Sequence, residues 1–175
     1  MLRSAVTLLA CSMAFAQSGP GRPATDAEIT AKDLTVLPNG AGLPKGHGDA
    51  KQGQGLFKDK CAVCHNEKGE GRENQYPALA GGIGSLSGSS PKKTVGSYWP
   101  YATTLFDYVR RAMPYDHPRS LSTDEVYSVS AFVLYLNGIV KETEELNEKT
   151  LPQIKMPNRD GFVPDSRPDV KSKGQ

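Results

Sequence analysis

Apolar residues recur at helical spacing over residues 123–137, and this stripe is the strongest pattern in the chain. Its members are Val126, Val129, Phe132, Val133 and Leu136. Ser122 and Glu125 can form a capping box at its start, in which each side chain accepts a hydrogen bond from a free backbone N–H. Gly138, after Asn137, is a common stop signal. The pattern predicts an amphipathic helix over residues 123–137.

A second helix is expected from about residue 49. Asp49 is a suitable cap with Gln52 three residues on, and an apolar face that includes Phe57 follows. Gly53 and Gly55 are poor helix formers, so we expect them to allow the close approach of another helix. We predict that Gly53 and Phe57 dock on the Val129–Val133 stripe of the final helix.

A third, shorter helix is expected from about Leu105 to Arg111, with Thr104 and Asp107 as its caps. The chain has no alternating strand pattern. The core is therefore predicted to be helical and to cover about residues 48–140.

The remaining segments are predicted to be mostly irregular. Residues 17–47 are rich in Gly, Pro and Ala and indicate an extended arm or linker, and residues 80–91 indicate a Gly- and Ser-rich loop. Residues 141–175 are interpreted as a C-terminal tail. Its charged part, 141–149, is expected to form a short solvated helix, and the rest to pack on the domain or to hang free.

The N-terminus has the features of a secretory signal peptide over residues 1–16. Arg3 supplies a positive start, residues 5–10 are small and apolar, and Ala14-Phe15-Ala16 is an A-x-A cleavage signal. Cys11 is an alternative lipoprotein cleavage site. No later run approaches the roughly 18 apolar residues needed to span a bilayer, so we expect a soluble protein exported to the periplasm.

The motif that points to a chemistry is Cys61-Ala62-Val63-Cys64-His65. C-x-x-C-H is the attachment site of c-type haem: each thiol forms a thioether with a haem vinyl group, and the histidine ligates the iron. Two residues between the cysteines let one turn of chain reach both vinyl groups. The motif therefore predicts one covalent haem c.

Two other sites use similar motifs. Half of a zinc site would need further Cys or His ligands, and the chain has no second Cys pair. A thioredoxin-like dithiol would need a βαβ context that the flanking sequence does not offer. Once residues 1–16 are cleaved, Cys61 and Cys64 are the remaining cysteines and the haem uses both, so no structural disulfide is expected.

Composition agrees with a haem protein and argues against a nucleic-acid-binding one. The chain has 21 basic and 19 acidic residues, close to balance, whereas nucleic-acid-binding domains usually carry a basic excess. The length suits about one domain. Hydrophobic residues make up 37%, a lean content that a haem would supplement in the core.

The sixth iron ligand has four candidates: Met113, Met156, His47 and His117. Met113 is favoured because haem of the electron-transfer type commonly pairs His with Met. Pro114 would end the preceding helix and stiffen the loop that holds the sulfur. Met156 also precedes a proline but lies beyond the expected core. The alternative is that Met113 fills the core.

Other residues are candidates for the haem surroundings. The Pro77 carbonyl is suitably spaced to accept a hydrogen bond from the non-ligating N–H of His65, although Pro77 also suits an ordinary turn. Tyr98 and Trp99 would form a haem-edge cluster that bonds the propionates, or would pack as ordinary aromatic residues. Arg110 would pair with a propionate or remain solvated.

The order of these features resembles that of class I cytochromes c: helix, C-x-x-C-H, Pro-x-Leu loop, Met-Pro loop and final helix, over about residues 48–140. Residues 96–114 and 155–162 further resemble the cytochrome subunits that partner periplasmic molybdenum sulfite dehydrogenases and the Sox sulfane dehydrogenase. The resemblance implies an all-α class I cytochrome c fold with His65 and Met113 as axial ligands. The single C-x-x-C-H motif resembles the monohaem members.

We therefore expect a periplasmic monohaem cytochrome c, an electron-transfer protein rather than an enzyme. It would accept single electrons from a molybdenum sulfite or sulfane dehydrogenase and pass them to a further cytochrome or oxidase. The alternatives are a catalytic or ligand-binding haem protein with an open sixth position, and a general periplasmic electron shuttle. A methionine on the iron would favour electron transfer over catalysis.

Overall fold

The computed structural model describes residues 21–163 and 165. The chain divides into two compact units, Met1–Asp33 and Leu34–Gln175. The predicted signal peptide over residues 1–16, with Cys11, lies outside the described residues. Within the described part, no helix is both long and apolar enough to cross a bilayer.

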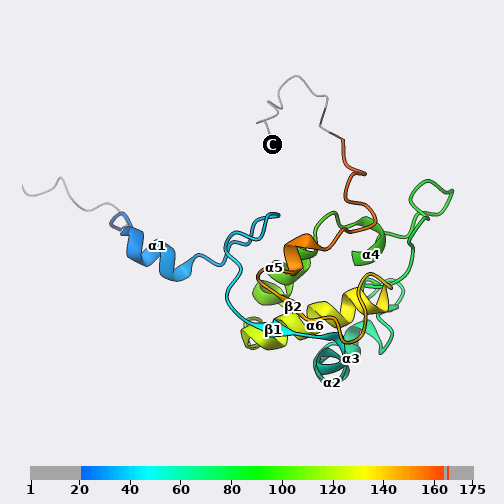
Figure 1. The fold of residues 1–175 in the computed structure, drawn as a ribbon, viewed down its shortest axis with the longest axis horizontal. Helices are drawn as coiled ribbons and strands as arrows, with labels where there is room; N and C mark the ends of the chain where they lie inside the picture. Colours follow the sequence, from blue (N-terminus) through cyan, green and yellow to red (C-terminus); the bar gives the residue numbers. More distant parts are fainter. Residues whose placement is uncertain (1–20, 164, 166–175) are drawn as a thin grey trace, which may run out of the picture. The chain divides into compact units, whose positions relative to one another are not determined.

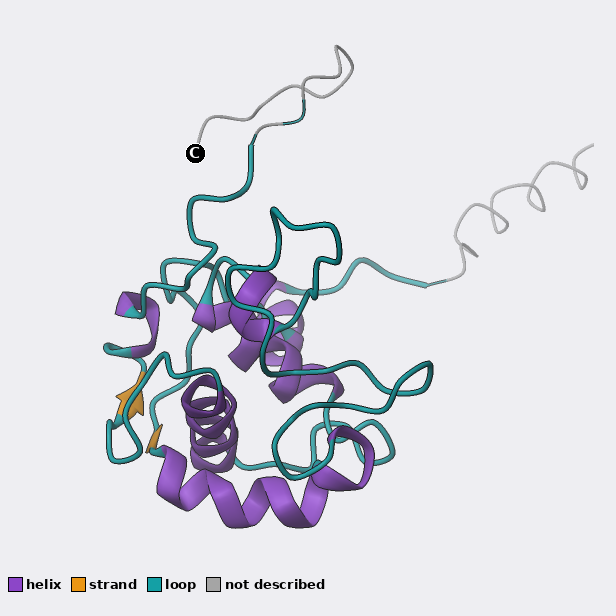
Figure 2. Ribbon diagram, turned by 90° about the vertical axis from the view of Figure 1, so that its right-hand side faces the viewer, coloured by secondary structure: helices purple, strands orange, loops and turns teal. Residues whose placement is uncertain are grey.

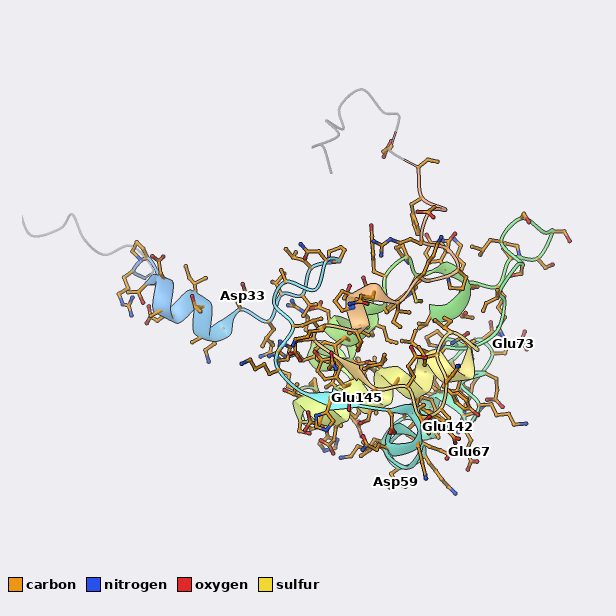
Figure 3. The ribbon with its side chains drawn as sticks, viewed as in Figure 1. Asp33, Asp59, Glu67, Glu73, Glu142 and Glu145 are labelled. Atoms are coloured by element: carbon orange, nitrogen blue, oxygen red, sulfur yellow. The ribbon has the colours of Figure 1, made fainter. Side chains whose placement is uncertain are left out.

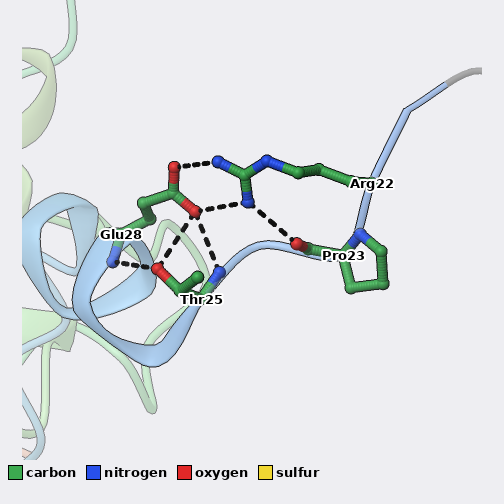
Figure 4. A network of polar contacts seen from close by, with 4 residues as sticks. All are labelled: Arg22, Pro23, Thr25 and Glu28. Atoms are coloured by element: carbon green, nitrogen blue, oxygen red, sulfur yellow. Dashed lines mark hydrogen bonds and ion pairs between the residues drawn. The ribbon is translucent and has the colours of Figure 1, made fainter.

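The first unit contains α1, which spans Asp26–Lys32. Its capping box joins the Thr25 hydroxyl to the Glu28 N–H at 3.3 Å and the Glu28 carboxylate to the Thr25 N–H at 2.9 Å. Arg22 donates two further hydrogen bonds to that carboxylate (Figure 4). The prediction of an extended arm over residues 17–47 was wrong here, because this local capping signal starts a helix. None of the residues of α1 is buried.

The second unit is helical, with one short strand pair among its described residues (Figures 1 and 2). Its elements are β1 (His47–Gly48), α2 (Ala50–Lys60), α3 (Ala62–His65), α4 (Val95–Tyr98), α5 (Ala102–Ala112), α6 (Thr123–Leu136), β2 (Leu146–Asn147) and the 3-10 turn η1 (Leu151–Gln153). Helix α2 crosses α6: in Figure 1, α2 is seen along its axis and α6 from the side.

The predicted contact between α2 and α6 is confirmed, and Phe132 of the predicted stripe takes part in it. A Cβ atom added to Gly53 would overlap the Ser128 carbonyl and lie 2.9 Å from Cβ of Phe132. The rings of Phe57 and Phe132 lie 5.1 Å apart. Gly53 therefore packs on Ser128 and on Phe132, which lies within the predicted Val129–Val133 stripe. The same expectation was wrong for Gly55, which has open space where its side chain would be.

The capping predictions were right for α6 and wrong for α5. Helix α6 begins with the reciprocal hydrogen bonds of Ser122 and Glu125. Helix α5 begins at Ala102, three residues before the predicted start, and its N-cap Tyr101 makes no side-chain cap bond. The Asp107 carboxylate bonds to groups outside the first turn of α5, so it does not cap the helix.

The segment after α6 does not form the predicted helix over residues 141–149. It turns and forms β2, which pairs antiparallel with β1, Leu146 opposite Gly48 and Asn147 opposite His47. Leu146 is fully buried. Burial of this one leucine and pairing with β1 outweigh the weak helical tendency of a charged run.

The chain then returns to the core instead of leaving it. Leu151 and Met156 are buried together with Phe106 and Leu134 in one hydrophobic cluster. The expectation that Met156 lies beyond the core was wrong. A lone methionine in a proline-containing segment gives no periodic signal, so its burial could not be read from the local sequence.

Candidate functional site

The C-x-x-C-H motif forms a single helical turn directly after α2. Cys61 is the last capping residue of α2, and its N–H donates to the Phe57 carbonyl at 2.8 Å. The Cys61 carbonyl in turn accepts from the N–H groups of Cys64 at 3.1 Å and His65 at 2.9 Å. Residues three and four apart share a helix face, so both sulfurs and the imidazole lie on one side of this turn. Val63, between the cysteines, is 67% exposed.

The predicted hydrogen bond between His65 and Pro77 is present: Nδ1 of the imidazole lies 3.0 Å from the Pro77 carbonyl oxygen. A carbonyl accepts hydrogen bonds and does not donate them, so Nδ1 carries the proton. Nε2 is then left with its lone pair, as a metal ligand requires.

The loop that carries Pro77 is held close to the motif. The Gly71 N–H donates to the His65 carbonyl at 2.9 Å, and the Leu79 N–H donates to the Gly69 carbonyl at 2.7 Å. Gly71 has a φ of 71°, and an added Cβ would lie only 2.6 Å from the Tyr76 carbonyl oxygen. Glycine is required there for the loop to approach His65 so closely.

The environment of the cysteines differs from that of a redox dithiol. The pKa of the Cys61 thiol is raised to about 11, mainly by burial; the charge of Lys60 opposes the rise and Cys64 adds to it. Reactive dithiols require the opposite shift, because the thiolate is the reactive form. Within residues 21–163 and 165, no three His, Cys, Asp or Glu residues gather as metal ligands. Figure 3 shows the exposed carboxylates spread over the surface, among them Asp59, Glu73 and Glu145.

Met113 occupies a different environment from the other three candidates. It is the C-cap of α5, half-buried against the core, and is followed by the buried Pro114. Met156 is 1% exposed within the core, and His47 is exposed in β1. His117 is exposed and lies 3.2 Å from the Asp116 carboxylate.

The donor groups of Cys61, Cys64, His65 and Met113 fit a haem. An imidazole, a thioether and two thiols are the donor set of covalent haem with His/Met ligation. Half-buried apolar side chains pack on the core from the same elements and loops: Leu56, Leu79, Trp99, Met113 and Leu136. Such partly covered apolar side chains suit contact with a flat apolar ring.

The three other predicted neighbours of the haem make the following contacts. The Tyr98 ring meets Phe162 edge-on at 5.2 Å and lies under Lys93, while the Trp99 ring meets Tyr108 edge-on at 5.8 Å. Arg110 is half-buried in the last turn of α5.

Sequence reasoning missed Asn137, which it used only as a helix stop. The Asn137 side-chain amide donates to the Leu79 carbonyl at 3.1 Å, and its oxygen accepts from the Gly81 N–H at 3.1 Å. It thereby ties the loop after Pro77 to the end of α6. An Asn-Gly step signals a helix end, and its long-range partners leave no local signal.

Comparison with known proteins identifies close relatives of this arrangement. The cytochrome c family model matches residues 50–137. The crystal structure of the sulfane dehydrogenase SoxCD from Paracoccus pantotrophus contains a chain that is 47% identical, with a TM-score of 0.78. That match covers 86% of this chain and 74% of the other.

Two curated proteins are similar over shorter stretches. The thiosulfate dehydrogenase of Psychrobacter arcticus is 28% identical over 119 residues, which are 63% of this chain and 34% of that protein. The cytochrome c of Sesamum indicum is 37% identical over 76 residues, which are 39% of this chain and 67% of that protein. This chain thus spans about a third of the length of the first of these relatives.

Proposed function

Because this chain belongs to the cytochrome c family, we propose that it takes up single electrons from a molybdenum dehydrogenase that oxidises sulfite or a sulfane sulfur compound. It then passes them to a further cytochrome or oxidase in the periplasm. Like that family, it carries a covalent haem c and is an electron-transfer protein rather than an enzyme. The observation that carries the proposal is the likeness to SoxCD, which extends well beyond the haem motif.

The residues of the site would divide the work of holding the haem. The thiols of Cys61 and Cys64 would hold the haem through thioether bonds. His65 would ligate the iron through Nε2, and Met113 would ligate it through its sulfur. The bound haem supplies an iron that takes up and releases one electron.

The surrounding chain keeps both ligands in place and limits the access of water. The hydrogen bond from Nδ1 of His65 to Pro77 fixes the orientation of the imidazole and makes Nε2 a stronger ligand. The half-buried side chains of Leu79 and Leu136 would offer apolar atoms to the ring. Burial of the haem and its methionine ligand both raise the reduction potential.

Electrons would enter at the haem edge next to Val63. This residue lies between the two attachment cysteines and is 67% exposed, so the edge of the ring fixed there lies close to the protein surface. A small apolar contact is enough for a transient redox encounter, which often buries less than about 1,200 Å².

Rapid mixing tests the proposed donor. The oxidised protein is mixed with the co-encoded dehydrogenase and its sulfur substrate, and reduction is followed by absorbance. Val63→Asp should slow the second-order step at least about tenfold, because it puts a charge into an apolar contact. Leu37→Asp alters another exposed apolar side chain and should not. If the dehydrogenase reduces another exported cytochrome but not this one, the partner is wrong and a general shuttle is favoured.

The sixth ligand is tested separately by the near-infrared charge-transfer band of ferric haem with methionine sulfur bound. Met113→Ala should abolish this band. Met156→Leu is the matched control, because it keeps the volume of a buried side chain and should leave the band unchanged. A band that survives Met113→Ala would place the ligand elsewhere. Wild-type protein without the band would favour the open-site alternative.

A further inference from the structure

Helix α5 holds Met113 at its C-terminal end, and one carboxylate connects this end to a distant part of the chain. Oδ1 of Asp107 accepts a hydrogen bond from the backbone N–H of Val36 at 3.1 Å. Oδ2 of the same side chain accepts from Nε of Arg111 at 2.8 Å. Asp107 therefore joins a segment 71 residues earlier to the last turn of α5.

Both contacts of the Asp107 carboxylate are partly shielded from water. The Asp107 side chain is 24% exposed and that of Arg111 is 38% exposed. Partial burial reduces screening by water, and hydrogen bonds to an ionised carboxylate are shorter and stronger than neutral ones. Arg111 is two residues before Met113, so a shift of this turn moves the methionine backbone with it.

The other end of α5 is also held by segments outside residues 50–137. The Asn158 amide donates to the Tyr98 carbonyl at 2.7 Å, and the Arg159 guanidinium lies over the ring of Tyr101, the N-cap of α5. The Thr103 hydroxyl donates to the Pro38 carbonyl at 3.4 Å. The hydrogen bond between Asp107 and Val36 adds an attachment nearer the end of the helix, beside the core contacts of Leu105, Phe106 and Val109.

We propose that Asp107 is a positioning residue for the sixth iron ligand: it holds the last turn of α5, and with it the sulfur of Met113, against the segment at Val36. This inference rests on the proposed role of Met113 as that ligand. The arm before β1 thereby contributes to the strength of the iron–sulfur bond, although it lies outside the residues that the family model matches.

Displacement of the methionine by added imidazole measures this role in the full-length holoprotein. If the tie at Asp107 keeps the sulfur on the iron, loosening it raises the fraction of molecules open to imidazole, and the apparent affinity for imidazole rises in proportion. Asp107→Ala, which removes both hydrogen bonds, should raise this affinity about fivefold or more, and Arg111→Met, which removes one, should raise it less. The near-infrared band should weaken in the same order.

A double variant separates this connection from a general loss of stability. Asp107→Asn and Arg111→Met break the same ion pair, so the double variant should bind imidazole no more tightly than the tighter-binding single variant. Glu28→Gln is the matched control, because it breaks another Arg–carboxylate pair in the first unit and should leave imidazole binding unchanged.

The outcomes distinguish this inference from the proposed ligand. Unchanged imidazole affinity and band intensity in Asp107→Ala, with the band lost in Met113→Ala, would overturn the positioning role alone. A band that persists in Met113→Ala would overturn the ligand assignment, and the positioning role with it. An equal effect of Glu28→Gln would also contradict the proposed connection.

Discussion

Helices α1 and α2 begin with the same kind of capping box, Thr25 with Glu28 and Asp49 with Gln52, but only α2 buries a face. Phe57 and Gly53 of α2 lie against α6, whereas every residue of α1 remains exposed. Capping therefore decides where each helix starts. The stability of each helix depends on which of its residues are buried, since a short isolated helix is marginally stable in water.

The largest effect is expected from adding a side chain to Gly53, where α2 and α6 are in direct contact. Gly53→Ala places a methyl group on the Ser128 carbonyl, so α2 has to move away from α6. We expect a loss of about 3 kcal/mol in the free energy of unfolding of the holoprotein. Gly55→Ala, in the same helix and with open space around it, should instead stabilise by about 0.5–1 kcal/mol. Equal melting temperatures for the two variants would contradict this packing.

The next effect sets a buried residue of α6 against an exposed one of α1. Val133 is 1% exposed, so Val133→Ala leaves a cavity and should lower the free energy of unfolding by about 2 kcal/mol. Ile29, in α1, is 54% exposed, and Ile29→Ala should change it by less than about 0.5 kcal/mol. Urea titration of both variants measures the difference. A similar cost at both positions would mean that the face of α1 is also buried.

A smaller effect concerns one polar contact at the start of α6. The hydroxyl of Tyr127 donates to the Pro44 carbonyl at 2.9 Å, and burial raises its pKa to about 12. Tyr127→Phe should lower the free energy of unfolding by about 1 kcal/mol at neutral pH. A pKa raised in the folded state contributes stability that is fully present below about pH 10 and is lost as the pH rises through 12. The variant should lack this alkaline loss, and unfolding measured from pH 8 to 12 checks it.

The same distinction between local and long-range contacts limits what the sequence predicts about the fold. The capping boxes and apolar spacing of α2 and α6 are local, and they predicted the start of α2 and both ends of α6 within one residue. Asp107 has the local features of a cap, but its partners include Val36, far away in the chain. Its long-range use is why the start of α5 was placed three residues late.

The site divides in the same way. The spacing of Cys61, Cys64 and His65 is local and determines how they lie on one turn. The hydrogen bond from His65 to Pro77 was also predictable, because a short loop joins the two residues. Asn137 and Met156 were misinterpreted, because their partners are brought to them only by the tertiary fold.

The smallest effect is expected in α1, where the helix depends on its cap alone. The Arg22 ion pair, followed by the hydrogen bonds from Thr25, lowers the pKa of Glu28 from 4.5 to about 2. A pKa lowered in the folded state contributes stability that is fully present above about pH 4.5 and is lost as the pH falls through 2. The helical amide chemical shifts of α1 should therefore disappear over that range, and Glu28→Gln should weaken them at neutral pH. Because α1 buries no side chain, Glu28→Gln should not move the melting of the second unit at neutral pH, as α2 substitutions do. If Glu28→Gln lowered that melting temperature as well, the helix would be stabilised by more than its cap, and the contrast with α2 would fail.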